Sequence, residues 1–134
     1  MIVVNSSPLI SFGKQGVLYI LKDCFKKIII PESVYNEIIK HKDCIESIAL
    51  NKAINENWIT IEKIQVNPAL KTQQLGEGEK EAISLAVKHN IILIIDDDSA
   101  KTYASLLRIE AHGSLFVIYV ACVKKLITKD KAKE

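Results

Sequence analysis

Short aliphatic runs alternate along the chain with segments whose apolar residues recur at helical spacing. Such runs are typical of strands in a parallel sheet that is buried on both faces. The five consecutive aliphatic residues at 91–95 give the strongest strand signal, and the run at Trp58 is expected at an edge of the sheet. The predicted strands are residues 2–4, 28–30, 58–61, 91–95 and, more briefly, 109–111.

Helical spacing fills the segments between these runs. Residues 9–25 follow it but are expected to divide into two helices at Gly13 and Gly16. Further helices are predicted from Pro31, over 45–55, from Gly78 to Asn90, over 99–107 and over 115–126. Residues 65–74 contain Pro68, lack periodicity and are predicted to form a loop, and the charged tail at 128–134 is expected to fray.

Strands that alternate with helices predict an α/β fold. We therefore expect a three-layer α/β/α sandwich with a central, mostly parallel sheet. The length of 134 residues suits one domain, which we assign to residues 1–134.

Composition limits the functional classes without choosing among them. The net charge is only +2, and Arg108 is the single arginine. The chain has no signal-peptide pattern and no apolar run of about 18 residues, so no membrane span is expected. Its three cysteines, Cys24, Cys44 and Cys122, form no metal-binding spacing and are expected to be free and buried. These features predict a cytoplasmic protein.

Polar residues at the ends of predicted strands are the candidates for chemistry, because ligands of such sheets bind beyond the carboxyl ends of the strands. Asn5, Ser6 and Ser7 follow the first strand, and three aspartates follow residues 91–95. Further acidic residues lie near strand–helix junctions. The candidate acids are Glu37, Glu77, Glu79, Glu81, Asp96, Asp97 and Asp98.

If the two buried strands are neighbours, these carboxylates can converge. Two carboxylates about 5 Å apart repel by roughly 3 kcal/mol at an effective dielectric constant of about 20. A hard divalent cation such as Mg²⁺ or Mn²⁺ removes that repulsion and prefers oxygen ligands. Each acid also has a structural interpretation, because carboxylates favour helix N-termini and Glu77 and Glu81 could form a solvated helix face.

Five segments in order resemble the PIN-like nuclease domains. The first, VVNSSPLI, is similar to the opening V-V-D-[TS]-S-P-L-I of that family. The second, IPESVYNEI, is similar to I-P-x-x-V-x-x-E-[IL], and the third, LGEGEKEAI, to L-[DG]-x-G-E-x-E-A-I. The last two, IIDDDSAK and HGSL, are similar to L-[IL]-D-D-x-x-A-R and x-G-[TS]-[LI].

The resemblance implies a metal-dependent ribonuclease that uses Mg²⁺ or Mn²⁺ and cleaves RNA. Carried over by position, the acidic ligands would be Glu37, either Glu79 or Glu81, and Asp97, with Asp96 adjacent. Ser7 matches a hydroxyl that commonly follows the first acid. Because residues two apart on a helix face different ways, Glu79 and Glu81 cannot share one role. Family members are frequently toxins paired with an antitoxin protein.

Asn5 departs from the pattern, because the family has an aspartate at this position. An amide oxygen can still bind a metal ion, but it brings no negative charge. We therefore expect weaker metal binding and reduced or absent catalysis. The alternatives are an inactive PIN-like module that binds RNA or a protein partner, and an unrelated flavodoxin-like binding domain. A homodimer is also expected, in which Leu18, Tyr19 and Leu21 lie at the interface unless they belong to the core.

Overall fold

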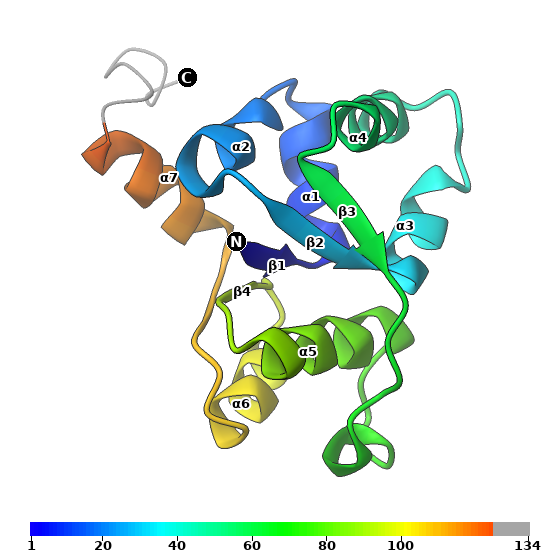
Figure 1. Cartoon of the computed structure of the whole chain (residues 1–134), viewed down its shortest axis with the longest axis vertical. Coiled ribbons are helices and arrows are strands. Elements are labelled where there is room, and N and C mark those ends of the chain that lie inside the picture. The colour runs from blue at the N-terminus through cyan, green and yellow to red at the C-terminus, as the bar shows by residue number, and fades with distance from the viewer. Residues whose placement is uncertain (125–134) are drawn as a thin grey trace.

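The computed structural model describes residues 1–124, and within them five strands form one all-parallel sheet (Figure 1). The spatial order is β3-β2-β1-β4-β5, so the strand around residues 59–62 lies at an edge, as predicted. The strands are β1 (Ile2–Val4), β2 (Ile28–Pro31), β3 (Ile59–Glu62), β4 (Leu93–Ile94) and β5 (Ala111–His112).

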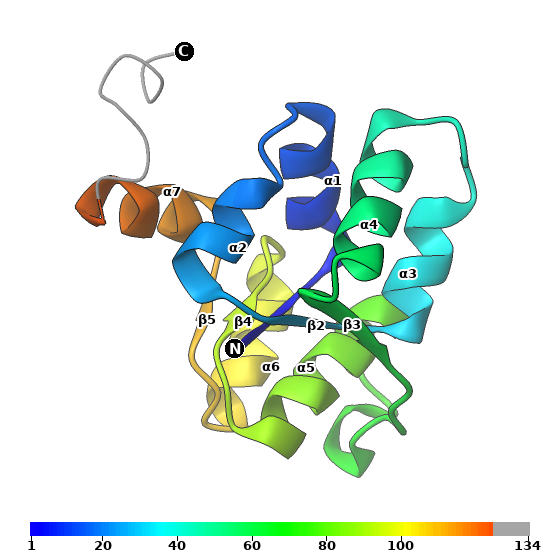
Figure 2. The ribbon, with the colours of Figure 1, turned by 45° about the horizontal axis from the view of Figure 1, so that its top comes forward.

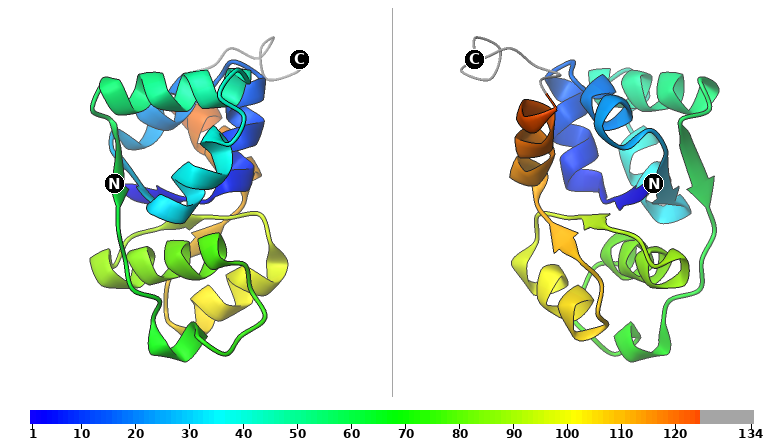
Figure 3. Two further views of the ribbon diagram at one scale, coloured as in Figure 1. Left: turned by 90° about the vertical axis from the view of Figure 1, so that its right-hand side faces the viewer. Right: turned by 60° about the vertical axis from the view of Figure 1, so that its left-hand side comes forward.

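Helices cover both faces of the sheet. Figures 2 and 3 show α1 to α4 and α7 on one face, and α5 and α6 on the other. The predicted three-layer α/β/α sandwich is therefore confirmed. The helices are α1 (Ser6–Lys14), α2 (Tyr19–Phe25), α3 (Glu32–Ile39), α4 (Ile45–Asn55), α5 (Glu77–His89), α6 (Asp98–Leu106) and α7 (Ser114–Val123), with a 3₁₀ turn, η1 (Pro68–Leu70), in the predicted loop.

Alternate side chains of each strand belong to two separate hydrophobic cores, because successive side chains of a strand point to opposite faces of the sheet. Ile2 and Val4 pack in the core beneath α1 to α4 and α7, whereas Val3 packs in the core against α5 and α6. The neighbouring strands divide in the same way. All three residues of β1 are almost fully buried, which explains the continuous aliphatic run.

Gly13 does not interrupt the first helix, contrary to the prediction. It lies within α1, and a Cβ atom there would stand 2.9 Å from Cα of Glu46 on α4. The glycine thus permits the close approach of two helices. The chain breaks after Lys14 instead, where Gly16 has a φ of +71° that glycine adopts at little cost.

The strand predicted over residues 91–95 is also shorter than expected. Asn90 adopts a left-handed conformation that ends α5, and the N–H of Ile91 donates to the carbonyl of Ala86. Ile91 therefore completes a helix end, and β4 contains only Leu93 and Ile94. Helix α7 begins at Ser114, while its predicted end at residue 126 and the tail at 128–134 lie outside the described residues.

Three further expectations concern exposure. All three cysteines are free, but only Cys24 is buried, so the prediction of burial was wrong for Cys44 and Cys122. Leu18 and Leu21 belong to the hydrophobic core, and Tyr19 is exposed. Among the described residues, no helix is long and apolar enough to cross a membrane.

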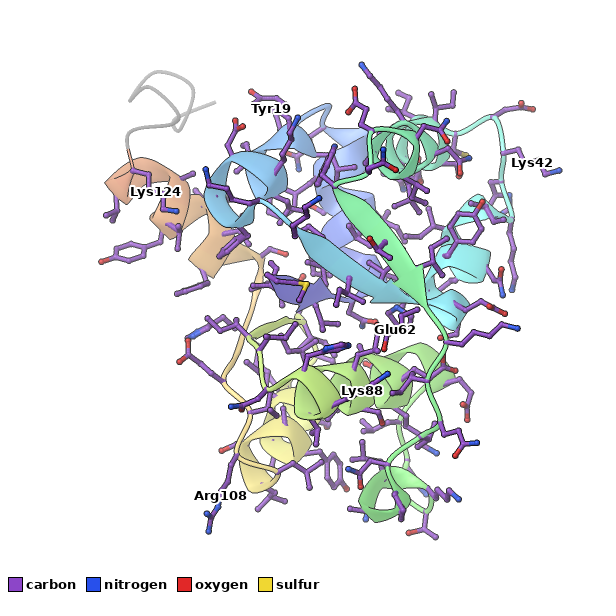
Figure 4. The ribbon with its side chains drawn as sticks, in the orientation of Figure 1. Tyr19, Lys42, Glu62, Lys88, Arg108 and Lys124 are labelled. Carbon is purple, nitrogen blue, oxygen red and sulfur yellow. The ribbon has the colours of Figure 1, made fainter. Side chains whose placement is uncertain are left out.

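Glu62, at the end of the edge strand β3, contacts two residues of α5. Its carboxylate accepts a hydrogen bond from Lys88 Nζ at 2.8 Å, and both of its oxygens lie 3.1 Å from His89 Nε2 (Figure 4). The Lys88 bond, followed by the contact with His89, holds the pKa of Glu62 below its usual value, against the opposing effect of burial. A lowered pKa in the folded state stabilises the fold at every pH above the pKa of the unfolded chain.

Glu62→Gln is expected to lower the free energy of unfolding by about 1 kcal/mol at pH 7, a value that allows for the partial exposure of the group. The loss should shrink as the pH falls below about 4, because protonation removes the same stabilisation from the native protein. Urea unfolding at several pH values measures it. Glu110→Gln, in an exposed pair with His112, is the control and should change stability by less than about 0.5 kcal/mol. An equal loss at pH 3 and pH 7 would contradict the assignment.

Candidate functional site

The two strands that carry the sequence candidates are neighbours. Strand β1 pairs in parallel with β4, and Val4 lies opposite Ile94. The N–H of Asn5 donates to the carbonyl of Ile94 at 2.9 Å. Asn5 and Asp96 therefore follow adjacent strands at the same carboxyl edge of the sheet, where ligands of such sheets bind.

A cavity of about 470 Å³ opens at this edge, where the first turns of three helices meet. The helices are α1, α3 and α5, and each contributes backbone or side-chain polar groups near its N-terminus. Polar atoms make up much of the wall. The lining residues are Asn5, Ser6, Ser7, Ser33, Glu37, Lys40, Gly76, Glu77, Gly78 and Glu79.

Asn5 is the buried polar residue of this cavity, with only 5% of its surface exposed. It occupies the N-cap position of α1, yet its side chain makes no capping hydrogen bond. Within the described part of the chain, its Oδ1 atom is buried and has no hydrogen-bond partner, and the same holds for Oγ of Ser33. Leaving a buried acceptor unsatisfied costs roughly 1–3 kcal/mol, so a donor or cation in the cavity would stabilise this arrangement.

Gly78 leaves space beside these two orphaned oxygens. A Cβ atom at this position would lie 3.8 Å from Oδ1 of Asn5 and 3.8 Å from Oγ of Ser33. The nearest atom would be Cγ2 of Val34 at 3.4 Å, an ordinary contact distance. The absent side chain is therefore not required by crowding, and a methyl group here would lie against both buried oxygens.

Six of the sequence candidates line this cavity together: Asn5, Ser6, Ser7, Glu37, Glu77 and Glu79. Glu79 is already engaged, because its Oε1 accepts a hydrogen bond from the N–H of Gly76 at 2.9 Å and caps α5. Glu37 and Ser7 are exposed at the cavity wall.

Glu81 lies apart from them. It lines a separate pocket of about 370 Å³ with Glu32, Asn36 and Lys63, on the other side of Ser33. This placement separates Glu79 from Glu81, as their two-residue spacing on a helix requires.

Asp96 and Asp97 are not among the residues that line the cavity. Asp96 accepts two hydrogen bonds of 2.7 Å from Ser114, one from its backbone N–H and one from its hydroxyl, at the start of α7. Asp97 is the N-cap of α6 and accepts a hydrogen bond from the N–H of Ala100 at 2.9 Å. Both carboxylates therefore stabilise helix N-termini in this structure.

Lys40 and Ser33 line the cavity but were not among the predicted site residues. Lys40 ends α3, three residues after Glu37, and brings the one positive side chain to this wall. The helical spacing of Glu37 and Lys40 was a signal that could have found it. Ser33 carried no signal, because its role depends on how α3 packs against α5.

The chemistry of the cavity fits a hard divalent cation. Its side-chain donors are carboxylate, amide and hydroxyl oxygens, which Mg²⁺ and Mn²⁺ prefer. No three His, Cys, Asp or Glu side chains between residues 1 and 124 lie close enough to hold a metal by themselves. A cation would therefore take the amide oxygen of Asn5 with one or two carboxylates and complete its shell with water, as Mg²⁺ commonly does.

A parallel sheet between two helical layers, with polar side chains gathered at its carboxyl edge, is a PIN-like α/β fold. The sequence matches the PIN domain family over residues 1–134. The chain belongs to this family, whose members are generally associated with nuclease activity and generally use divalent metals.

Solved structures share the fold. A PilT N-terminus domain protein, SSO1118, from the archaeon Sulfolobus solfataricus P2 matches with a TM-score of 0.65 and 21% identity, covering 89% of this chain and 92% of its own. A domain of a functionally unknown protein from Methanocaldococcus jannaschii matches with a TM-score of 0.53 and 24% identity, covering 82% and 87%. No curated protein matches the sequence.

Proposed function

We propose that this chain is a PIN-type ribonuclease that depends on Mg²⁺ or Mn²⁺, and that the amide at Asn5 weakens its activity. The unpartnered Oδ1 of Asn5, buried in a cavity with several carboxylates, is the observation that carries the proposal. Buried polar atoms nearly always have a hydrogen-bond partner, and a bound ion or water is one way in which an acceptor at a cavity obtains it.

In this proposal, Asn5 and Glu37 hold the cation, with Ser7 as a hydroxyl at the same wall. A bound ion supplies Lewis-acid stabilisation of the charge on a phosphodiester. Lys40 at the cavity wall contacts the phosphate and offsets its charge. The first turns of α1, α3 and α5 place backbone N–H groups where they favour an anion.

The biological part of the proposal is a toxin acting on cytoplasmic RNA, with a small antitoxin protein as its partner. It rests on family membership and on the resemblance of the five motifs. A homodimer belongs to the same expectation, with Tyr19 as the exposed member of the predicted interface residues.

An inactive PIN-like module that binds RNA or a protein partner is the second candidate. The absence of three close acidic ligands among residues 1–124 favours it. Asp96 and Asp97 do not line the cavity and accept hydrogen bonds at helix N-termini, so their carboxylates are not at the wall that a cation would contact.

Cleavage of varied RNAs by the purified protein distinguishes the two candidates. We expect slow cleavage with Mn²⁺ or Mg²⁺, faster cleavage by Asn5→Asp, and none after EDTA treatment. Glu37→Gln should abolish the activity, which excludes a contaminating nuclease. If neither the natural chain nor Asn5→Asp cleaves any RNA with either metal, the inactive module becomes the better description.

A further inference from the structure

The candidate carboxylates near Asn5 differ in whether they already accept hydrogen bonds from the protein. Glu79 is held by the N–H of Gly76 at 2.9 Å, so a cation could use only its other oxygen or would have to break the cap. Glu81 faces a different pocket, and Asp96 and Asp97 cap α7 and α6. These four are poorly placed or already bonded.

Glu77 is not engaged in this way. It is the first residue of α5, it is exposed, and it lines the same cavity as Asn5. Within the part of the chain that the structure describes, its carboxylate makes no hydrogen bond or ion pair. The carboxylate of Glu37, on the facing helix α3, likewise makes no hydrogen bond or ion pair with any residue that the structure describes.

The buried amide of Asn5 lines the same cavity as these two acids. Oδ1 of Asn5 has no partner, and it lies beside Gly78, the residue that follows Glu77 in the chain. The amide, Glu37 and Glu77 therefore come from α1, α3 and α5 around one cavity. Counting Glu37, Glu77, Glu79 and Lys40, the wall carries a net charge of −2, from three carboxylates and one ammonium, which one divalent cation neutralises.

We infer that Glu77, rather than Glu79, is the second carboxylate that binds the divalent cation, together with Glu37 and the amide oxygen of Asn5. This inference rests on the proposed metal dependence and adds a ligand that the motif resemblance does not contain, since position 77 is variable in the motif. Glu77 supplies negative charge that the amide at position 5 lacks. Glu79 then has a positioning role, because it fixes the first turn of α5 that carries Glu77.

Calorimetric titration of the metal-free protein with Mn²⁺ tests the assignment without relying on catalysis. Glu77→Gln should weaken Mn²⁺ binding about tenfold. Glu81→Gln, four residues later on the same helix but in the other pocket, is the matched control and should bind as the natural chain does. Glu79→Gln should retain most of the affinity and the fold, because the glutamine amide oxygen can still accept the N–H of Gly76.

The outcomes separate this inference from the proposed function. If Mn²⁺ binds the natural chain and Asn5→Asp but Glu77→Gln binds equally well, Glu77 is not a ligand and the inference fails alone. A loss confined to Glu79→Gln would assign the role to Glu79 instead. If neither the natural chain nor Asn5→Asp binds Mn²⁺, the metal dependence itself fails and the inference falls with it. Circular dichroism of each variant verifies that the compared proteins are folded.

Discussion

Asn5→Asp is expected to raise the affinity for Mn²⁺ ten- to hundredfold, or by about 1.4–2.8 kcal/mol. The substitution keeps the size of the side chain and adds a negative charge to a cavity that already has an unpartnered oxygen at this position. The attraction between that charge and a divalent ion is large, because the residue is 5% exposed and water screens it poorly. Calorimetric titration measures the change in affinity.

The same substitution should destabilise the metal-free protein by about 2 kcal/mol, because it buries a charge without a partner. Urea unfolding in EDTA and in Mn²⁺ measures this cost and its recovery, since a ligand that binds only the native state stabilises it. Asn55→Asp, at the exposed end of α4, is the control and should show neither effect. An Asn5→Asp protein with unchanged metal affinity would show that Oδ1 is not a ligand position.

The strand pattern predicted the sheet well because both faces of it are buried. Val3 and Val4 serve different cores, yet both must be apolar, so a continuous run marks the strand. The helix break at Gly13 was predicted wrongly because the role of this residue depends on a contact with a residue far away in the sequence. Gly13 suggests a helix break in the sequence, whereas the structure uses it for the close approach of α4 at Glu46. No local pattern contains that information.

The site was partly predictable for a similar reason. The rule that ligands bind beyond the carboxyl ends of strands pointed to Asn5, and the structure places that residue at this edge because β1 and β4 are neighbours. The rule could not tell which acids remain free. Asp96 and Asp97 have the residue type of metal ligands, but one oxygen of each accepts a backbone N–H at a helix N-terminus. Metal ligation and helix capping thus look alike in a sequence, and only the contacts distinguish them.

Gly78→Ala is expected to weaken Mn²⁺ binding tenfold or more without destabilising the fold. The new methyl group would lie 3.8 Å from Oδ1 of Asn5, against the atom that the proposal assigns to the cation. It would meet Val34 at 3.4 Å, which is an ordinary contact, and alanine in a helix lowers the entropy of the unfolded chain. The free energy of unfolding in EDTA should therefore stay constant or rise by up to about 1 kcal/mol.

The combination of unchanged or higher stability with weaker metal binding is what makes this substitution informative. A structural glycine would give the opposite result, a loss of stability with little change in affinity, as expected for Gly13→Ala, where the Cβ would stand 2.9 Å from the backbone of Glu46. Urea unfolding and Mn²⁺ titration of both variants make the comparison. If Gly78→Ala binds Mn²⁺ as tightly as the natural chain does, the cation does not approach Asn5 past Gly78, and the oxygens of Asn5 and Ser33 need another explanation.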